Sequence, residues 1–419
     1  MLDLWCTEAP RLVRELSMTG KALEGVKVLE YASFVTGPYC TKLLADLGAE
    51  VIKTERPSVG DEARRRGPFP SDIPHPERSG LFLYLNTNKL GISLDPGTPT
   101  GRKIFLTLVK WADILVEDKP PKVMEELGLT YHSLKLVNPK LIMTSITPFG
   151  QTGPYRDYKA YCLNISHGAG AGYLTPVDSS EAELGPIKGG GFFDDYCNGL
   201  SAAAATLVAL YSRETTGEGQ HIDVSEQEAS IAYDRVEIGM FASDGFINTR
   251  VQTPKGTALL PCRDGYVLIA MGEDRHWKAL VKVMGNPEWT GHERLKDREG
   301  RVKHSQEMNS LIAEWTKPFC KEEIYHKLAS AGIPAGVVRS QSDLIEHDEQ
   351  LKARGFFVEI EHPEAGKLIY PSAPYWLSET PWRLERPAPI IGQHNEEVYT
   401  WLLGYTKEEL VRLREAGII

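Results

Sequence analysis

The sequence predicts an α/β protein, with a parallel β-sheet in a large domain and a second, smaller α+β domain. Short apolar segments alternate with helical segments up to about residue 146, a pattern typical of a parallel sheet covered by helices on both faces. After Gln220 the pattern changes to several helices with few strands. The length of 419 residues also exceeds the usual size of one hydrophobic core.

The first series of elements follows from short runs that are rich in Val, Ile and Leu. Such runs, bounded by polar or glycine residues, predict buried strands with helices between them. Gly48 is expected to end the first helix, because glycine adopts the left-handed conformation of a C-cap at little cost. The expected strands are residues 26–31, 51–54, 91–94, 114–117 and 141–146, and the expected helices are 39–47, 104–111 and 123–127.

The second series begins with an expected strand at 221–224 and one long helix at 226–244. Residues 248–261 read as turn-like, because they contain Pro254 and Gly256. Prolines and glycines make 350–385 an extended segment that returns along the chain. The smaller domain is expected to contain a strand at 266–270 and helices at 276–284, 306–315 and 321–331, and the chain ends in helices at 398–404 and 407–416.

Composition and charge exclude several classes of protein. With 42% hydrophobic and 25% charged residues the chain is typical of globular proteins, and its net charge of −10 argues against nucleic acid as a partner. Apolar stretches are interrupted well before the length of a membrane span, and the acidic start does not match a secretion signal. The six cysteines are scattered, which favours a cytoplasmic location without a zinc site or disulfide framework.

Two adjacent carboxylates, Asp194 and Asp195, stand where an alanine-rich helix is expected over residues 200–210. The glycine run 189–191 precedes them, and because glycine has no side chain, other backbone or a ligand can come close to the chain there. The N-terminal turn of a helix carries unpaired N–H groups and partial positive charge, which keep a carboxylate there ionised. A lone aspartate at this position is most often only a helix cap, but the acidic pair and the glycine run favour a functional site.

This stretch resembles the class III CoA-transferases, a superfamily that also contains the α-methylacyl-CoA racemases. The motif consists here of Asp195, Gly199, Ala209-Leu210, Arg213, Thr216-Gly217 and Gly219-Gln220. Further motifs occur in the family's order from Leu23 to the C-terminus, and this ordered set makes the resemblance specific. They lie at residues 23–31, 37–38, 43–53, 60–61, 85–89, 93–95, 150–154, 264–266, 332–334 and 387–394.

The resemblance implies a particular architecture. A Rossmann-like large domain is built from both chain ends, a small α+β domain lies between them in sequence, and two such monomers interlock as a homodimer. Residues 1–22 then form an N-terminal extension. The remaining divisions are the large CoA-binding domain at 23–228 and 386–419, a linker helix at 229–249, the small domain at 250–345 and a returning linker at 346–385.

The activity that the resemblance implies is transfer of CoA from an acyl-CoA donor to a free carboxylic acid. Asp195 is then the nucleophile, and a CoA thioester is a substrate while no cofactor is permanently bound. N–H groups of residues 189–191 are candidates to stabilise the oxyanions. No metal site is implied, because His221, Asp223 and Glu226 lack a ligand pattern.

Contacts with CoA are also implied by the family's pattern. The turn after the first strand and the following helix start are expected to hold part of the nucleotide. The expected contacts are Phe34, Val35, Gly37, Arg56, Asn88, Lys89, Leu94 and Lys119. The chain departs from the family after the fourth strand, where residues 117–122 and Glu126 replace an Asn-Phe segment and an arginine. The family's glycine-rich loop is also not evident near residues 253–260.

The acyl pocket is expected to involve Tyr161, His167, Gly190, Gly191 and Asp194. In the racemases a histidine base stands where this chain has Tyr161, which disfavours α-proton exchange but leaves a racemase or epimerase as an alternative. A non-catalytic CoA-binding protein is a second alternative. A nicotinamide-dependent dehydrogenase is rejected, because residues 32–38 contain no Gly-x-Gly-x-x-Gly. The identity of the two acids is not encoded in these motifs.

Overall fold

The computed structural model describes residues 20–176, 185–233, 235–249 and 257–419. The described residues form two compact units. The large unit comprises those of 1–175, 186–247 and 353–419, and the small unit comprises those of 176–185 and 248–352. Most of the expected N-terminal extension, and residues 253–256 of the segment 253–260, therefore lie outside the described residues. Within the part of the chain that is described, no helix is long and apolar enough to cross a membrane.

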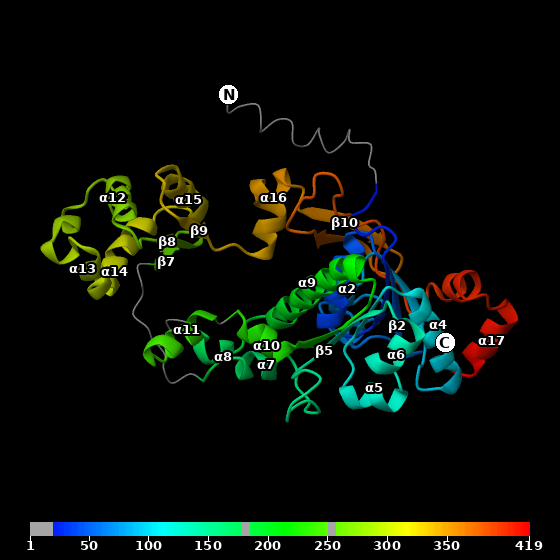
Figure 1. The fold of residues 1–419 in the computed structure, drawn as a ribbon. Helices are drawn as coiled ribbons and strands as arrows, with labels where there is room; N and C mark the ends of the chain where they lie inside the picture. The colour runs from blue at the N-terminus through cyan, green and yellow to red at the C-terminus, as the bar shows by residue number, and fades with distance from the viewer. Residues whose placement is uncertain (1–19, 177–184, 234, 250–256) are drawn as a thin grey trace. The chain divides into compact units, whose positions relative to one another are not determined.

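A six-stranded parallel sheet forms the centre of the large unit (Figure 1), and its strand order is β3-β2-β1-β4-β5-β6. The chain crosses from one half of the sheet to the other between β3 and β4, so the switch in strand order lies between neighbouring strands β1 and β4. The strands are β1 (Lys27–Tyr31), β2 (Glu50–Glu55), β3 (Lys89–Ser93), β4 (Ile114–Glu117), β5 (Ile142–Thr147) and β6 (His221–Ser225).

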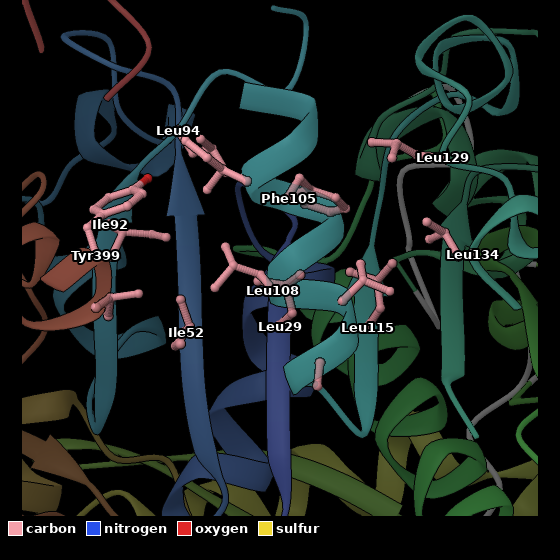
Figure 2. Packing of buried hydrophobic residues seen from close by; sticks show 14 of the residues in the cluster. Leu29, Ile52, Ile92, Leu94, Phe105, Leu108, Leu115, Leu129, Leu134 and Tyr399 are labelled. Carbon is pink, nitrogen blue, oxygen red and sulfur yellow. The ribbon is translucent and has the colours of Figure 1, made fainter. Parts of the chain in front are cut away.

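Helices cover both faces of this sheet because successive strand residues point to opposite faces. Leu29 of β1 packs in one buried cluster with Phe105 and Leu108 of α4 (Pro99–Trp111) (Figure 2). Its neighbour Val28 packs in a second cluster with Leu44 of α2 (Thr36–Asp46) and with alanines of α9 (Phe193–Thr216). The apolar strands thus supply both cores of the large unit.

Several shorter helices complete the large unit. The α-helices are α3 (Gly80–Leu85), α5 (Pro121–Leu127), α6 (Tyr131–Val137), α7 (Cys162–Gly168), α8 (Ala171–Leu174), α10 (Glu226–Ile231), α11 (Arg235–Asp244) and α17 (Lys407–Glu415). Helix α16 (Glu349–Ala353) lies where the chain passes from the small unit back to the large one. Single 3₁₀ turns occur at Glu62–Arg65 and Pro70–Asp72, and a π-helical turn at Glu397–Leu402.

The C-terminal segment covers the edge strand β3. The N–H of Gly91 donates to Nδ1 of His394 at 2.9 Å, and the N–H of His394 donates back to the Gly91 carbonyl at 2.9 Å. Two residues further, the N–H of Ser93 donates to Oδ1 of Asn395 at 2.9 Å. These bonds satisfy edge groups of the sheet with side chains and backbone about 300 residues away in sequence.

The small unit has its own antiparallel sheet and core. Its strands β7 (Thr257–Cys262), β8 (Gly265–Ala270) and β9 (Ala335–Val337) pair in the order β7-β8-β9. Val267 and Ile269 of β8 are fully buried against Leu280, Ile312 and Ile324 of three helices. The helices are α12 (Asp274–Val283), α13 (Arg298–Lys303), α14 (Ser305–Thr316) and α15 (Lys321–Ser330), with 3₁₀ turns at Glu288–Gly291 and Glu293–Leu295 and a π-helical turn at Asp343–His347.

The predicted fold class is confirmed, with a six-stranded parallel sheet and smaller antiparallel sheets. Two local predictions were wrong. The long helix at 226–244 is two helices, since α10 ends at Ile231 and α11 begins at Arg235. The turn-like segment ends in strand β7. The predicted extended segment contains two extended strands that pair as a hairpin, β10 (Phe357–His362) and β11 (Gly366–Pro371).

Candidate active site

The turn between β1 and α2 is held in an unusual shape by two carboxylates. Phe34 adopts a left-handed conformation with φ of 70°, which is uncommon for a bulky residue. Its N–H donates to Oδ1 of Asp61 at 2.9 Å, and the N–H of Ser33 donates to Oδ2 of Asp118 at 2.6 Å. These bonds fix the backbone of the turn and offset its strain.

Asp61 belongs to a buried cluster of charged side chains. Nζ of Lys53 lies 2.7 Å from carboxylate oxygens of both Asp61 and Glu30, and Nζ of Lys89 lies 2.9 Å from Glu30. Burial alone would raise the pKa of Glu30, but the two ammonium groups lower it to about 2. Glu30 is therefore ionised at neutral pH, and Lys53, which is paired with both Glu30 and Asp61, holds Asp61 in the position that orients the turn.

Asp195 lies in the first turn of α9, as its sequence position predicts. Its side chain is only 4% exposed, and Oδ2 has no hydrogen-bond partner among the described residues. Burial raises the pKa of Asp195 to about 6. The Asp194 charge acts in the same direction, whereas the thiol of Cys162 and the ammonium of Lys188 oppose it. A buried carboxylate with a vacant acceptor is poised to interact with a ligand.

Glycine at position 199 allows the start of α9 to approach α2. A Cβ atom there would lie 2.7 Å from the carbonyl oxygen of Thr36 and 3.2 Å from the ring of Tyr39. Both neighbours belong to α2. Gly219 is required for a similar reason, because a Cβ atom there would lie 2.0 Å from the carbonyl oxygen of Leu141. Gly199 thus allows α9 to approach α2, and Gly219 allows the segment after α9 to approach the residue that precedes β5.

Asp195 lines a pocket of about 610 Å³ within the large unit. The pocket adjoins the carboxyl ends of β1, β4, β5 and β6, which is where parallel α/β sheets usually bind ligands. Basic side chains, aromatic rings and acids all contribute to its wall. The residues that line it include Phe34, Val35, Thr36, Asp118, Lys119, Lys122, Arg156, Tyr158, Lys159, Tyr161, Cys162, Asp195 and Glu226.

The structure brings together one part of the set that the sequence predicted. Phe34, Val35, Lys119, Tyr161 and Asp195 line the same pocket. Nζ of Lys119 lies 2.8 Å from Oδ1 of Asp118. The ring of Tyr161 is 67% exposed at the start of α7, beside the pocket mouth. These residues come from four separated segments, and the sheet topology is what gathers them.

Other predicted contacts lie away from Asp195. Lys89 is fully buried, with Nζ bound to Glu30 and to the carbonyl of Pro38. Leu94 packs in the core under α4. Asn88 donates to Oδ1 of Asp46 and to the carbonyl of Arg383, so it ties the C-terminal segment to α2.

Five further predicted residues occupy the surface or the start of a helix. Arg56 is exposed after β2. Gly37 lies in α2, where a Cβ atom would clash with Ala32 at 2.4 Å. His167 is exposed, and its Nδ1 bonds the carbonyl of Leu163 in its own helix. Gly190 and Gly191 are exposed before α9, and Gly191 has φ of 64°.

Asp194 and Asp195 share the thiol of Cys162 as a neighbour. Asp194 is half-buried, and the Cys162 thiol donates to its Oδ2 at 3.9 Å, while the same thiol lowers the pKa of Asp195. The carbonyls of Gly189 and Gly191 accept hydrogen bonds from Nζ of Lys188. Lys188 therefore holds the glycine run in front of α9 and brings a positive charge to the acidic pair.

Sequence reasoning missed Glu226 as a pocket residue. It was considered only as a metal ligand, and within the described residues no cluster of His, Cys, Asp or Glu could hold a metal ion. Oε1 of Glu226 accepts from Oγ1 of Thr36 at 2.7 Å. Burial raises the pKa of Glu226 to about 7, with Asp195 and Asp118 adding to the effect. Its place directly after β6, at the carboxyl end of the sheet, was the available signal.

Comparison with known proteins assigns the chain to a family. The model of CoA-transferase family III matches residues 23–395. A formyl-CoA:oxalate CoA-transferase of Rhodopseudomonas palustris is 32% identical over 95% of this chain and 97% of that protein. A succinyl-CoA–D-citramalate CoA-transferase of Chloroflexus aurantiacus is 31% identical over 95% of this chain and 98% of its own length.

A solved structure agrees with this assignment. The crystal structure of a CaiB/BaiF family protein from Brucella suis is similar with a TM-score of 0.81 at 31% identity. The alignment covers 92% of this chain and all of that chain. The chain therefore belongs to CoA-transferase family III.

Proposed function

We propose that this protein is an acyl-CoA:carboxylate CoA-transferase in which Asp195 is the covalent nucleophile. The observation that carries the proposal is the vacant Oδ2 of a carboxylate that is 4% exposed and lines a pocket of about 610 Å³; that oxygen has no partner in the described part of the chain. Family membership supports a CoA-transferase, and the relatives are named for CoA transfer between two acids.

The proposed reaction has two halves. An Asp195 oxygen attacks the thioester carbonyl of the donor, and the carbon–sulfur bond breaks. CoA thiolate is released, and the acyl group stays on Asp195 as a mixed aspartyl anhydride. The thiolate then attacks the aspartyl carbonyl, which releases the donor acid and leaves an aspartyl-CoA thioester. The acceptor carboxylate attacks the aspartyl carbonyl of this thioester, the carbon–sulfur bond breaks, and CoA thiolate is released as a second mixed anhydride forms. The thiolate then attacks the acyl carbonyl of this anhydride, and its bond to the Asp195 oxygen breaks. The product thioester leaves and Asp195 is regenerated as a carboxylate.

The surroundings of Asp195 suit this role. A carboxyl with a pKa of about 6 is mostly ionised at pH 7, yet its desolvated oxygen is a stronger nucleophile than one in water. Burial also protects the anhydride from hydrolysis. The first turn of α9 supplies N–H groups near the oxyanion. Lys119, Lys122, Arg156 and Lys159 are basic groups of the pocket that suit the phosphates of CoA.

The first test is replacement of the nucleophile. Asp195→Ala should lower the rate of transfer at least about 10³-fold, because no other group in the proposed mechanism forms the anhydride. Transfer by the wild type should rise with pH through about 6, since only ionised Asp195 attacks. The measurement is product acyl-CoA formed from a donor thioester and a free acid, and hydroxylamine trapping should label Asp195 in the wild type.

Asp244→Ala is the matched control, because this exposed aspartate lies at the end of α11 in the same unit. It should retain wild-type transfer. Asp195→Ala with more than a trace of activity would contradict the assignment. Exchange of an α-proton without transfer would instead support the racemase alternative, and acyl-CoA binding without either reaction would support a non-catalytic protein.

A further inference from the structure

Glu226 is held firmly in the pocket that contains Asp195. It begins α10 immediately after β6, and Oε1 accepts a hydrogen bond of 2.7 Å from Thr36, the first residue of α2. Thr36 is 7% exposed, and its carbonyl is the group that Gly199 of α9 approaches. Thr36 therefore links Glu226 to the helix that carries Asp195.

The charges that act on Glu226 are carboxylates, although Lys119, Lys122, Arg156 and Lys159 line the same pocket. Lys119 is paired with Asp118 at 2.8 Å, and Arg156 with Glu125 at 2.6 Å. Asp195 and Asp118 both act on it, and all three side chains line the same pocket. The pocket thus contains a second carboxyl group that the proposed transfer chemistry does not use. A second carboxylate on a substrate would be repelled by Glu226 in a partly desolvated space, where like charges interact more strongly than in water. Repulsion of one class of substrate is a common source of specificity.

We propose that Glu226 determines acyl specificity, by rejecting acyl groups with a second carboxylate and admitting uncharged monocarboxylic ones. This inference rests on the proposed CoA-transferase function. It predicts a substrate preference different from the acids in the names of two relatives, oxalate and citramalate, which carry two carboxylates each. An acyl group with a hydroxyl or amide donor would also fit, because a carboxylate accepts hydrogen bonds.

The discrimination should depend on pH. The pKa of Glu226 is raised to about 7 by burial, with Asp195 and Asp118 adding to the rise. Below pH 7 the protonated group can donate a hydrogen bond to a substrate carboxylate, and above pH 7 the ionised group repels it. Preference for the uncharged acyl group should therefore increase as pH rises from 6 to 8.

Butyryl-CoA and succinyl-CoA form a suitable pair, because their acyl chains have the same length and differ by a terminal methyl or carboxylate. We expect the wild type at pH 8 to show a kcat/KM at least tenfold higher for butyryl-CoA. Glu226→Gln retains the acceptor for Thr36 but removes the charge, and it should lower this ratio at least tenfold. Glu228→Gln, the same change at an exposed position two residues later, should leave the ratio unchanged.

A binding measurement separates this inference from the proposed function. Unreactive thioether analogues of the two acyl-CoA compounds can be titrated calorimetrically into the wild type and each variant. Glu226→Gln should tighten binding of the carboxylate-bearing analogue selectively. An unchanged affinity ratio, or a wild type that prefers the carboxylate-bearing analogue, would overturn the role of Glu226 even if transfer occurs. Absence of transfer from every thioester would overturn the proposed function, while the binding ratio still tests Glu226.

Discussion

Asp195 is both buried and required to carry a charge, and these properties oppose each other. Removing a carboxylate from water raises its pKa, so the folded chain holds its ionised form at a cost in stability. Within the described residues no hydrogen bond to Oδ2 reduces this cost. The residue is therefore expected to destabilise the fold in exchange for reactivity, as residues at functional sites often do.

Asp195→Asn should make the protein more stable at pH 8. The pKa is raised from 3.8 to about 6 in the folded state, so the penalty is absent below about pH 4, where both states are protonated. It grows between pH 4 and 6 and then stays constant at about 2–3 kcal/mol. Urea unfolding at pH 8 should show the variant to be more stable, and the difference should disappear near pH 3.5. Equal stability at both pH values would contradict the desolvation of Asp195.

At the scale of elements, the contact between α2 and α9 positions the site. Helix α2 carries Thr36, which binds Glu226, and α9 carries Asp195. Gly199 lets the two helices approach, since any side chain there would meet the backbone of Thr36. The separation of these helices therefore sets the spacing of the two carboxyl groups.

Gly199→Ala should lower the free energy of unfolding by about 1–3 kcal/mol, because the added Cβ overpacks a backbone contact. It should also reduce transfer, since Asp195 lies one helical turn before it. Gly239→Ala is the control: it lies in α11, and a Cβ there meets no atom of the described residues within 4 Å. Higher helix propensity should make that variant neutral or more stable by up to about 1 kcal/mol. The measurement is chemical denaturation of both variants. Equal changes in the free energy of unfolding would contradict the close contact between Gly199 and Thr36.

Elements with a clear local signal were predictable from the sequence. The strands of the large sheet are apolar runs, and Asp195 follows a glycine run at a helix start, so neither needed long-range information. The break between α10 and α11 was missed because neither Ala232 nor Tyr233 is a helix-breaking residue. Strand β7 was missed because Pro254 and Gly256 precede it and Leu259 within it is exposed.

The pocket was predictable only in part, because its wall is assembled from distant segments. Lys89 was predicted to contact CoA, yet it pairs with Glu30 in the core. Glu226 lines the pocket because β6, which it follows, pairs with β5 in the sheet, and this pairing is not visible in the local sequence. The local sequence shows which residues are charged and where they lie in a helix. It does not show which residues, distant in sequence, become their partners in the folded chain.

At the scale of the whole molecule, we expect a homodimer. Large apolar side chains are exposed on α9, among them Val208 at 68% and Tyr211 at 79%, and Phe241 on α11 is 59% exposed. Such exposure along helices of one unit is typical of surfaces that another chain covers. Analytical ultracentrifugation at nanomolar concentration should give twice the mass of one chain.

Val208→Glu together with Tyr211→Glu should weaken the dimer without lowering the stability of the isolated chain, because both side chains are exposed. Lys103→Glu, on the exposed side of α4, serves as a comparison that should leave the mass unchanged. A wild type that stays a well-folded monomer at nanomolar concentration would refute the expectation.

The covering of β3 by the C-terminal segment has a consequence for synthesis on the ribosome. Gly91 and Ser93 emerge early, but His394 and Asn395, which satisfy their N–H groups, follow about 300 residues later. At 5–20 residues per second this interval is roughly 15 to 60 s. Throughout that time the growing chain presents an unpaired strand edge to its neighbours on the same messenger, the situation in which newly made proteins aggregate. The yield of native protein should thus depend on chaperones that shield this edge until translation ends.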